Sequence, residues 1–307
     1  MRLDDYRNSD NVEFRGSSGG GGFGFGGGGG GGGGGMGGLL FALVASRFGI
    51  GGIVVLGIIM FFFGGLGSFG GGGQQAVGPQ QQVSGQRYSD CQTNETVRFS
   101  CAVLASTEDT WARLFQASGQ RYQPPTLVVY DRSNRSGCGA AQAAMGPFYC
   151  PADQRIYIDP TFFDQLATRF QAEGDFAQAY VIAHEVGHHI QTVTGISDTI
   201  RRGQSGVGEA AANALQVRME LQADCLAGVW AANARTRSGE AAMEPGDLQE
   251  GLRAAAAIGD DTLQQAAQGY TVPESFTHGT SAQRQQALNL GYRSGKPETC
   301  LTYTQDI

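Results

Sequence analysis

The chain is short of several features that mark particular protein classes. It has four histidines in 307 residues, a formal net charge of -7 and no basic run. Without clustered Lys and Arg, nucleic acid is not expected as a general partner. None of the six cysteines forms a Cys-x-x-Cys pair, so neither a zinc ribbon nor a thioredoxin-type redox site is expected. No internal repeat is evident, which leaves a single globular unit as the simplest interpretation.

Glycine, by contrast, is abundant, and its distribution divides the chain. Many of the 50 glycines fall between Gly19 and Gly38 and between Gly64 and Gly73. Such stretches have little apolar surface to offset the entropy lost on ordering. Residues 1–38 are therefore predicted to be a charged and glycine-rich disordered segment, and residues 67–87 a flexible linker. Residues 88–307 are long enough to bury a sizeable core as one domain.

The apolar segment between the glycine-rich stretches is predicted to be a transmembrane helix, residues 39–66. Phe48–Leu66 has no charged residue, and about 20 apolar residues cross a bilayer. A signal peptide is the alternative, but its charged region would be unusually long. Four arginines precede Phe48, and the next basic residue is Arg87. The positive-inside rule then predicts one span through the lipid bilayer, with a cytoplasmic N-terminus and the large domain outside.

All six cysteines follow the apolar segment. An even number of cysteines outside a membrane suggests disulfides in an oxidising compartment. Short loops favour Cys91–Cys101 and Cys138–Cys150, which leaves Cys225–Cys300 as the third pair. Unpaired, buried thiols are the alternative, because connectivity cannot be read from spacing alone.

Residues 88–307 are predicted to form a mostly helical α+β domain with one small sheet. Apolar periodicity and stop signals predict helices over Asn94–Ala117, Pro160–Phe170, Asp175–Val193, Gly208–Arg235, Leu248–Ala257 and Ser281–Gly291. Short β-branched and aromatic runs predict strands at Leu127–Tyr130, Phe148–Cys150 and Ile156–Ile158, the last two joined by a turn. Arg132–Ala140 is expected to be a polar loop. An exposed strand edge at Arg155–Asp159 is a hypothetical binding site for an extended peptide.

The motif that carries chemistry is His184-Glu185-Val186-Gly187-His188, inside a predicted helix. Residues four apart share a helical face, so His184 and His188 can hold one Zn²⁺ ion. Glu185 lies on a neighbouring face, from which it can act as the general base for a metal-activated water. The alternative is a pair of ordinary core or surface histidines. The predicted reaction is hydrolysis of peptide bonds.

A catalytic zinc site needs a third protein ligand. The metzincin pattern would place Gly at 191 and His at 194, but these are Gln191 and Thr194. Glu220 and Asp224, four apart on a later helix, offer a different solution. Glu220 is predicted to ligate the metal, and Asp224 to accept a hydrogen bond from a ligating histidine. The alternative for Glu220 is a solvated carboxylate on a helix face.

A donor for the developing oxyanion is the remaining need of such a site. His278 or Arg284 could supply it, and His278 is the preferred catalytic candidate. The alternative is that His278 merely lies in the loop before a helix capped by Thr280 or Ser281. His189 is rotated by about 100 degrees from its neighbour on the helix, so it is expected to be structural or to support a ligand.

These motifs together resemble a known group. Glu-x-x-x-Asp after His-Glu-x-x-His is similar to the gluzincins, the thermolysin-type zinc peptidases. More closely, the opening MRLDDYRNSDNVE, the glycine-rich tract, FYCPADQRIYIDP, AHEVGHHIQ, ELQADCLAGVW and SFTHGTSAQR resemble the bacterial "putative neutral zinc metallopeptidase" family. The resemblance covers nearly the whole chain. It implies a zincin-like, gluzincin-type domain with zinc on His184, His188 and Glu220, and with Glu185 as the catalytic acid/base.

The resulting expectation is a zinc metallopeptidase anchored in a bacterial inner membrane, with a periplasmic catalytic domain that cleaves peptides or proteins. A catalytically silent protein with a structural zinc ion is the rival from another class. Glu185 favours the enzyme, because a structural site needs no general base. A membrane scaffold held by the glycine-rich segment is a third interpretation.

Overall fold

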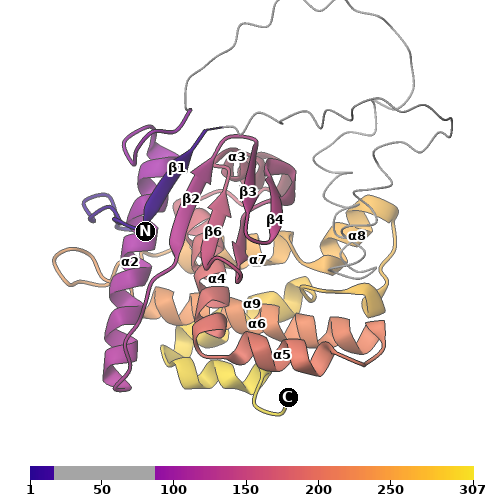
Figure 1. Ribbon diagram of the computed structural model, residues 1–307. Helices are drawn as coiled ribbons and strands as arrows, with labels where there is room; N and C mark the ends of the chain where they lie inside the picture. The colour runs from indigo at the N-terminus through magenta and orange to yellow at the C-terminus, as the bar shows by residue number, and fades with distance from the viewer. Residues whose placement is uncertain (17–86) are drawn as a thin grey trace, which may run out of the picture.

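The computed structural model describes residues 1–16 and 87–307, which form one folded body in which a small sheet lies against a set of helices (Figure 1). The helices are α2 (Glu95–Ala117), α3 (Thr161–Phe170), α4 (Asp175–Val193), α5 (Ile196–Gln204), α6 (Glu209–Asn233), α7 (Asp247–Ala257), α8 (Asp260–Gln268) and α9 (Ser281–Ser294). The strands are β1 (Val12–Arg15), β2 (Thr126–Tyr130), β3 (Ser133–Ser136), β4 (Gly139–Gln142), β5 (Phe148–Cys150) and β6 (Arg155–Ile158). The expected mostly helical α+β class is confirmed.

The predicted transmembrane helix 39–66 lies outside the described residues, as does almost all of the predicted linker 67–87. Within residues 1–16 and 87–307, none of the helices combines the length and apolar character that crossing a bilayer requires.

The predicted helices form where capping and periodicity place them. The Asn94 side chain caps α2 by accepting a hydrogen bond from the Val97 amide at 2.8 Å. α4 has the predicted bounds and is followed by Gly195 at φ 80°, a conformation that glycine adopts at low cost. α9 begins with a capping box between Thr280 and Gln283. Helices α5 and α8 are polar and short, and the sequence did not predict them.

The main sheet has the strand order β1-β2-β6-β5. β1, β2 and β6 run parallel, and β5 is antiparallel to β6 across the predicted turn. Two predictions are wrong here. The expected polar loop at 132–140 contains the hairpin β3–β4. The expected exposed edge at 155–159 is interior, because β6 pairs with β2 on one side and β5 on the other. β5 is an edge strand, with β1 at the opposite edge of the sheet.

Residues 1–16 are part of the folded body, so the prediction of disorder is wrong for these residues and the fold does not begin at residue 88. The rest of the predicted disordered segment 1–38 lies outside the described residues. β1 pairs with β2, with Val12 opposite Leu127. Before the strand, the Ser9 hydroxyl and the Asn11 amide donate to buried Glu108 on α2 at 2.5 and 2.8 Å. This segment is too short and too polar to be recognised as a strand from the sequence. Its strand partner β2 lies more than a hundred residues further along the chain.

The pairing of β1 with β2 also bears on membrane topology. Paired strands lie on the same side of any membrane, so residues 1–16 and 87–307 do as well. A single crossing by residues 39–66 would separate them. The predicted arrangement, with a cytoplasmic N-terminus and the domain outside, is therefore incompatible with this fold.

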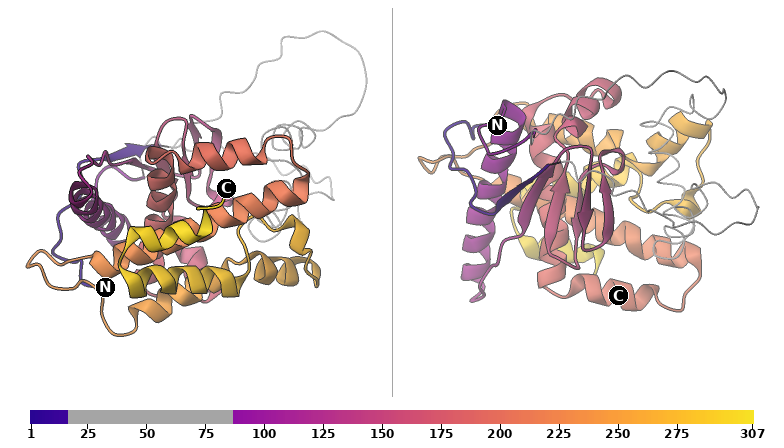
Figure 2. Two further views of the ribbon diagram at one scale, coloured as in Figure 1. Left: turned by 90° about the horizontal axis from the view of Figure 1, so that it is seen from below. Right: turned by 45° about the horizontal axis from the view of Figure 1, so that its top comes forward.

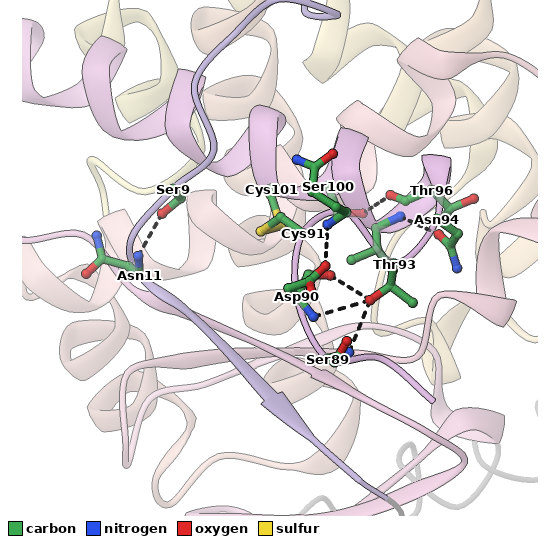
Figure 3. The surroundings of a disulfide bond; sticks show 12 residues. Ser9, Asn11, Ser89, Asp90, Cys91, Thr93, Asn94, Thr96, Ser100 and Cys101 are labelled. Atoms are coloured by element: carbon green, nitrogen blue, oxygen red, sulfur yellow. Dashed lines mark hydrogen bonds between the residues drawn. A yellow bond between two sulfur atoms is a disulfide. The ribbon is translucent and has the colours of Figure 1, made fainter. Parts of the chain in front are cut away.

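The structure confirms all three predicted disulfides. Cys91–Cys101 closes the turn before α2, Cys138–Cys150 joins the β3–β4 hairpin to the edge strand, and Cys225–Cys300 joins α6 to the C-terminal 3₁₀ segment Pro297–Tyr303. Figure 3 shows the first of these beside the N-terminal segment, whose Ser9 amide donates to the Cys101 carbonyl at 3.2 Å. The first disulfide thus lies where residues 1–16 meet the rest of the fold.

Helices α4, α6 and α9 pack closely because glycines face the contacts. A Cβ on Gly187 of α4 would lie 2.9 Å from the Ala223 carbonyl oxygen of α6. α6 and α9 lie side by side (Figure 2, left), and a Cβ on Gly291 would lie 1.8 Å from the Cys225 carbonyl oxygen. Since only glycine permits these approaches, the three helices are brought near enough for short side chains to meet across them.

Candidate metal centre

α4 and α6 bring together the three predicted metal ligands. The Nε2 atoms of His184 and His188 lie 3.2 and 3.4 Å from the same carboxylate oxygen, Oε2 of Glu220. Two donors about 2.0–2.1 Å from one tetrahedral zinc ion lie roughly 3.3 Å apart. The separations therefore match the edges of a zinc coordination shell, and nitrogen and carboxylate oxygen are donors that zinc accepts.

The second oxygen of Glu220 is held separately. Gln216, one turn earlier on α6, donates its side-chain amide to Oε1 of Glu220 at 2.9 Å. Glu220 is 5% exposed, so its charge is tolerated only because polar groups surround it. With Oε1 occupied, Oε2 is the oxygen that faces the two histidines.

The three side chains influence one another's protonation. Burial alone would lower the pKa of His188, but the Glu220 carboxylate outweighs burial and raises this pKa to about 9. Burial also opposes protonation of His184, yet Asp224 and Glu220 raise its pKa. Burial would raise the pKa of Glu220, but the two histidines hold it well below its usual value. The pocket thus stabilises positive charge between the rings, and a bound cation would replace protons there.

Asp224 holds the outer nitrogen of His184. Its Oδ1 accepts from His184 Nδ1 at 2.8 Å and from the Tyr180 hydroxyl at 2.5 Å. Arg284 on α9 donates to both oxygens, from Nε at 2.9 Å and from Nη2 at 3.0 Å. Burial opposes ionisation of Asp224, but Arg284 and His184 lower its pKa to about 2. The carboxylate fixes the ring so that Nε2 points to the ligand cluster.

Arg284 is therefore not placed as an oxyanion donor. It is 2% exposed and lies on the Nδ1 side of His184, at 3.5 Å from that nitrogen. The substrate side is the Nε2 side. Arg284 is close to His278 in sequence, but its long side chain reaches back into the helix interface, where the Asp224 carboxylate compensates its charge.

His188 has a different partner on its outer nitrogen. Nδ1 of His188 lies 2.9 Å from Oε1 of Gln191, one turn later on α4. Position 191 is one of the two that departed from the metzincin pattern. The Gln191 amide contacts Nδ1 of His188, as the Asp224 carboxylate contacts Nδ1 of His184.

Glu185 follows His184 on α4 and is 7% exposed. Its charge contributes to the raised pKa of His188, behind the larger effects of burial and Glu220. Glu185 is not among the three groups whose ligand atoms converge, as is expected of a general base.

Comparison with known proteins agrees with this geometry. The model of the family described as "Putative neutral zinc metallopeptidase" matches residues 1–303. The chain belongs to this zinc metallopeptidase family. A relative from Escherichia coli K12, named "Uncharacterized protein YpfJ", is 45% identical over 308 residues and covers 100% of both chains. A relative from Mycobacterium tuberculosis H37Rv, "Uncharacterized protein Rv2575", is 41% identical over 245 residues, which is 75% of this chain and 80% of the relative. No solved structure matches.

In this member of the zinc metallopeptidase family, the loop that carries His278 lies against α6, the helix that carries Glu220. The loop carrying His278 packs on α6, since a Cβ on Gly279 would lie 3.2 Å from Cγ1 of Val217 and 3.4 Å from Cδ2 of Leu221. Asp260 at the start of α8 organises this loop. It accepts from the His278 amide at 2.6 Å and lies 3.3 Å from His278 Nδ1.

Asp260 and Glu220 also set the charge of His278. Burial opposes protonation of the ring, but these two carboxylates raise its pKa. The Nδ1 contact with Asp260 leaves Nε2 as the nitrogen available to another group. Asp260 thus fixes the His278 ring through Nδ1.

His189 is structural and not part of the centre. It is fully buried, and its Nε2 donates to the Gln123 carbonyl at 2.7 Å. The Tyr149 hydroxyl lies 3.1 Å from Nδ1. Burial lowers the pKa of His189, so the ring is neutral and joins α4 to the edge strand β5.

Four polar residues of this centre were not predicted from the sequence. Tyr180 and Gln216 each lie four residues before a ligand on the same helix, a spacing that could have identified them. Asp260 and the buried Gln222 of α6 carry no such local signal, because they reach the site through tertiary packing alone.

Proposed function

We propose that the protein is a zinc-dependent peptidase of gluzincin type, with His184, His188 and Glu220 as the metal ligands. One observation carries the proposal. Two imidazole nitrogens, of His184 and His188, converge on one carboxylate oxygen of Glu220 at 3.2 and 3.4 Å. The family membership of residues 1–303 supports the same conclusion.

The protein's own residues supply the proton transfers of peptide hydrolysis. When bound, zinc supplies Lewis-acid activation of a water molecule and of the scissile carbonyl. Glu185 accepts a proton from the attacking water and later delivers it to the leaving amine. Both transfers require that the Glu185 carboxylate does not bind the metal. The position of Glu185 outside the His184–Glu220 contact allows this.

His278 is proposed to donate from Nε2 to the oxygen that becomes negative in the transition state. Asp260 supports this role in two ways. It holds the ring through Nδ1, and it anchors the loop through the backbone amides of Thr277, His278 and Gly279 at 2.7, 2.6 and 3.0 Å. A donor fixed before substrate arrives needs no reorganisation during the reaction.

The substrate is proposed to be an extended peptide that pairs with the edge strand β5. This strand lies at the end of the sheet order, and its Tyr149 contacts His189 of α4 at 3.1 Å. The edge therefore runs beside the helix that carries the ligands. Backbone pairing gives affinity for peptides with little dependence on their sequence.

The folded body is proposed to lie in an oxidising compartment outside the cytoplasm. All six cysteines form disulfides, and such bonds persist mainly in oxidising surroundings. Association of residues 39–66 with a lipid bilayer stays a prediction.

The test compares metal content and peptide cleavage in the wild type, Glu185→Gln and Glu220→Ala. The wild type is expected to bind one zinc ion and to cleave casein or a peptide library. Glu185→Gln should keep zinc and lose cleavage by at least about a hundredfold, the contribution expected of a general base. Glu220→Ala should lose zinc.

Glu209→Gln is the matched control for these two variants. Glu209 is exposed in the first turn of α6, so its substitution should change neither zinc content nor cleavage. Zinc retained by Glu220→Ala would contradict the ligand set. Zinc bound by the wild type without cleavage of any peptide would favour the silent zinc protein.

A further inference from the structure

His188 is connected to the C-terminal segment by two buried glutamines. Gln191 and Gln222, 0% and 1% exposed, lie on α4 and α6. The Gln191 side-chain nitrogen donates to the Met219 carbonyl at 2.7 Å and to Oε1 of Gln222 at 3.0 Å. The Gln222 nitrogen donates to Thr304 Oγ1 at 2.7 Å and to the Cys300 carbonyl at 3.3 Å. These contacts form a continuous path from a proposed ligand to the end of the chain.

The direction of every hydrogen bond on this path is determined. The backbone carbonyls of Met219 and Cys300 can only accept, so each must face a side-chain nitrogen. Both amides are therefore oriented, and Oε1 of Gln191 faces His188. Since this oxygen can only accept, Nδ1 of His188 must carry the proton. Nε2 is left facing Glu220 at 3.4 Å.

We infer that Gln191 and Gln222, the glutamine relay, are positioning residues that fix the tautomer and ring orientation of His188 and tie it to the C-terminal segment. The inference rests on the proposed zinc site. It extends that site beyond the three ligands to residues that touch neither metal nor substrate.

The C-terminal end of the relay is itself anchored. Cys300 is bonded to Cys225 on α6, and Arg218 donates to the Tyr303 carbonyl at 2.6 Å. Both anchors come from the helix that carries Glu220. The segment Pro297–Tyr303 therefore holds α6 and the glutamine relay in one register, which gives the C-terminus a part in shaping the metal centre.

The test measures zinc affinity of the full-length protein by competition with a chromophoric chelator. Gln191→Met removes the acceptor for His188 at similar volume and should weaken zinc binding about 10–100-fold, as loss of a partner behind a ligand does. Gln222→Met should weaken it by about tenfold, the lower end of that range. Gln178→Met is the control. Gln178 is also on α4 and donates to Thr96 and Ser100, so its loss should leave zinc affinity unchanged.

Non-additivity separates the relay from general damage. If Gln222 acts on His188 only through Gln191, then the double variant should bind zinc no more weakly than Gln191→Met alone. Gln222→Met combined with Asp224→Asn should be additive, because Asp224 supports the other histidine. Additive effects of the two glutamine substitutions would overturn the inference.

Thr304→Val covers the case in which a glutamine variant does not fold. Thr304 is half-buried at the far end of the relay, and its loss should lower zinc affinity without lowering the unfolding midpoint of the metal-free protein. Unchanged affinity in Thr304→Val and in every folded glutamine variant would overturn the relay. A wild type that binds no zinc would instead defeat the proposed function.

Discussion

His184 and His188 face the same glutamate, but their outer nitrogens are held by different chemistry. Behind His184 stands an ionised carboxylate, Asp224, with the guanidinium of Arg284 on its other side. Behind His188 stands the neutral amide of Gln191. A buried ion pair is costly to break, because the remaining charge has no compensation. Breaking a hydrogen bond between neutral amides leaves no uncompensated charge. The charged support should therefore dominate stability, while both supports should affect zinc affinity.

The largest effect is expected from Asp224→Ala, which breaks the charged support. Arg284 would stay buried without a carboxylate, and the expected loss is about 3–5 kcal/mol in the free energy of unfolding. Denaturant unfolding of the metal-free protein measures it. Asp306→Ala is the control. Asp306 pairs with Arg218 and its side chain is 73% exposed, and exposed ion pairs contribute little to the free energy of unfolding. A similar small loss in both variants would mean that the charged support carries no special weight.

Gly187→Ala should disturb both supports together. The added Cβ would lie 2.9 Å from the Ala223 carbonyl, so α4 and α6 must separate. Overpacking of this kind costs about 1–3 kcal/mol, and zinc affinity should fall as Glu220 moves from the histidines. Gly208→Ala is the comparison, because no atom lies within 4 Å of its added Cβ. If Gly187→Ala binds zinc as the wild type does, the close approach is not needed for the centre.

The Asp260–His278 pair tests how a charged support responds to pH. Burial opposes ionisation of Asp260, but His278 lowers its pKa below the usual 3.8. This contribution is present above pH 3.8 and is lost as pH falls through the lowered pKa. The pKa of His278 is raised above 6.5 by Asp260 and by Glu220 on α6, against Arg284 on α9. That contribution is present below pH 6.5 and is lost as pH rises through the raised pKa.

The stabilisation from this pair should therefore be largest between about pH 4 and 6.5. The difference in unfolding free energy between the wild type and Asp260→Asn, measured from pH 3 to 9, should pass through a maximum in that range. A difference that does not vary with pH would mean that the two groups are not coupled.

The smallest effect is expected from Tyr180→Phe. It removes one hydroxyl from Asp224, which keeps its bonds to Arg284 and His184. A loss of about 1 kcal/mol is expected, the usual net contribution of one hydrogen bond. Chemical unfolding measures this loss, and chelator competition should show only a minor fall in zinc affinity. A loss as large as that of Asp224→Ala would show that the hydroxyl, and not Arg284, holds the carboxylate.

Local pattern was enough to predict the parts of the fold that depend on neighbouring residues. The helix Asp175–Val193, the turn between β5 and β6 and the three disulfide pairs were all predicted from spacing and composition. The motif on α4 and the pair Glu220 and Asp224 were found because i, i+4 spacing defines a helix face. The structure brings these residues together, as the pattern required.

Features that depend on distant contacts were not predictable in this way. β1 is a four-residue strand of mixed polarity, and only its pairing with β2 makes it regular. Arg284 is one of many arginines until α9 is placed against α6. In the sequence, Gln191 shows only that the metzincin pattern is absent. Its contact with Gln222, which in turn contacts Cys300, forms only when distant elements pack together. Each of these residues acquires its function from tertiary packing.

The position of β1 also dictates an order of folding. Val12 must wait until Leu127 has been synthesised before their strands can pair, and contacts between residues so far apart in sequence form slowly. Until then β2 has an open edge, and unpaired edges attract other chains. A fragment that begins at residue 88 would keep that edge open permanently. Soluble production of the folded body is therefore expected to require the first sixteen residues, supplied on the same chain or added as a peptide.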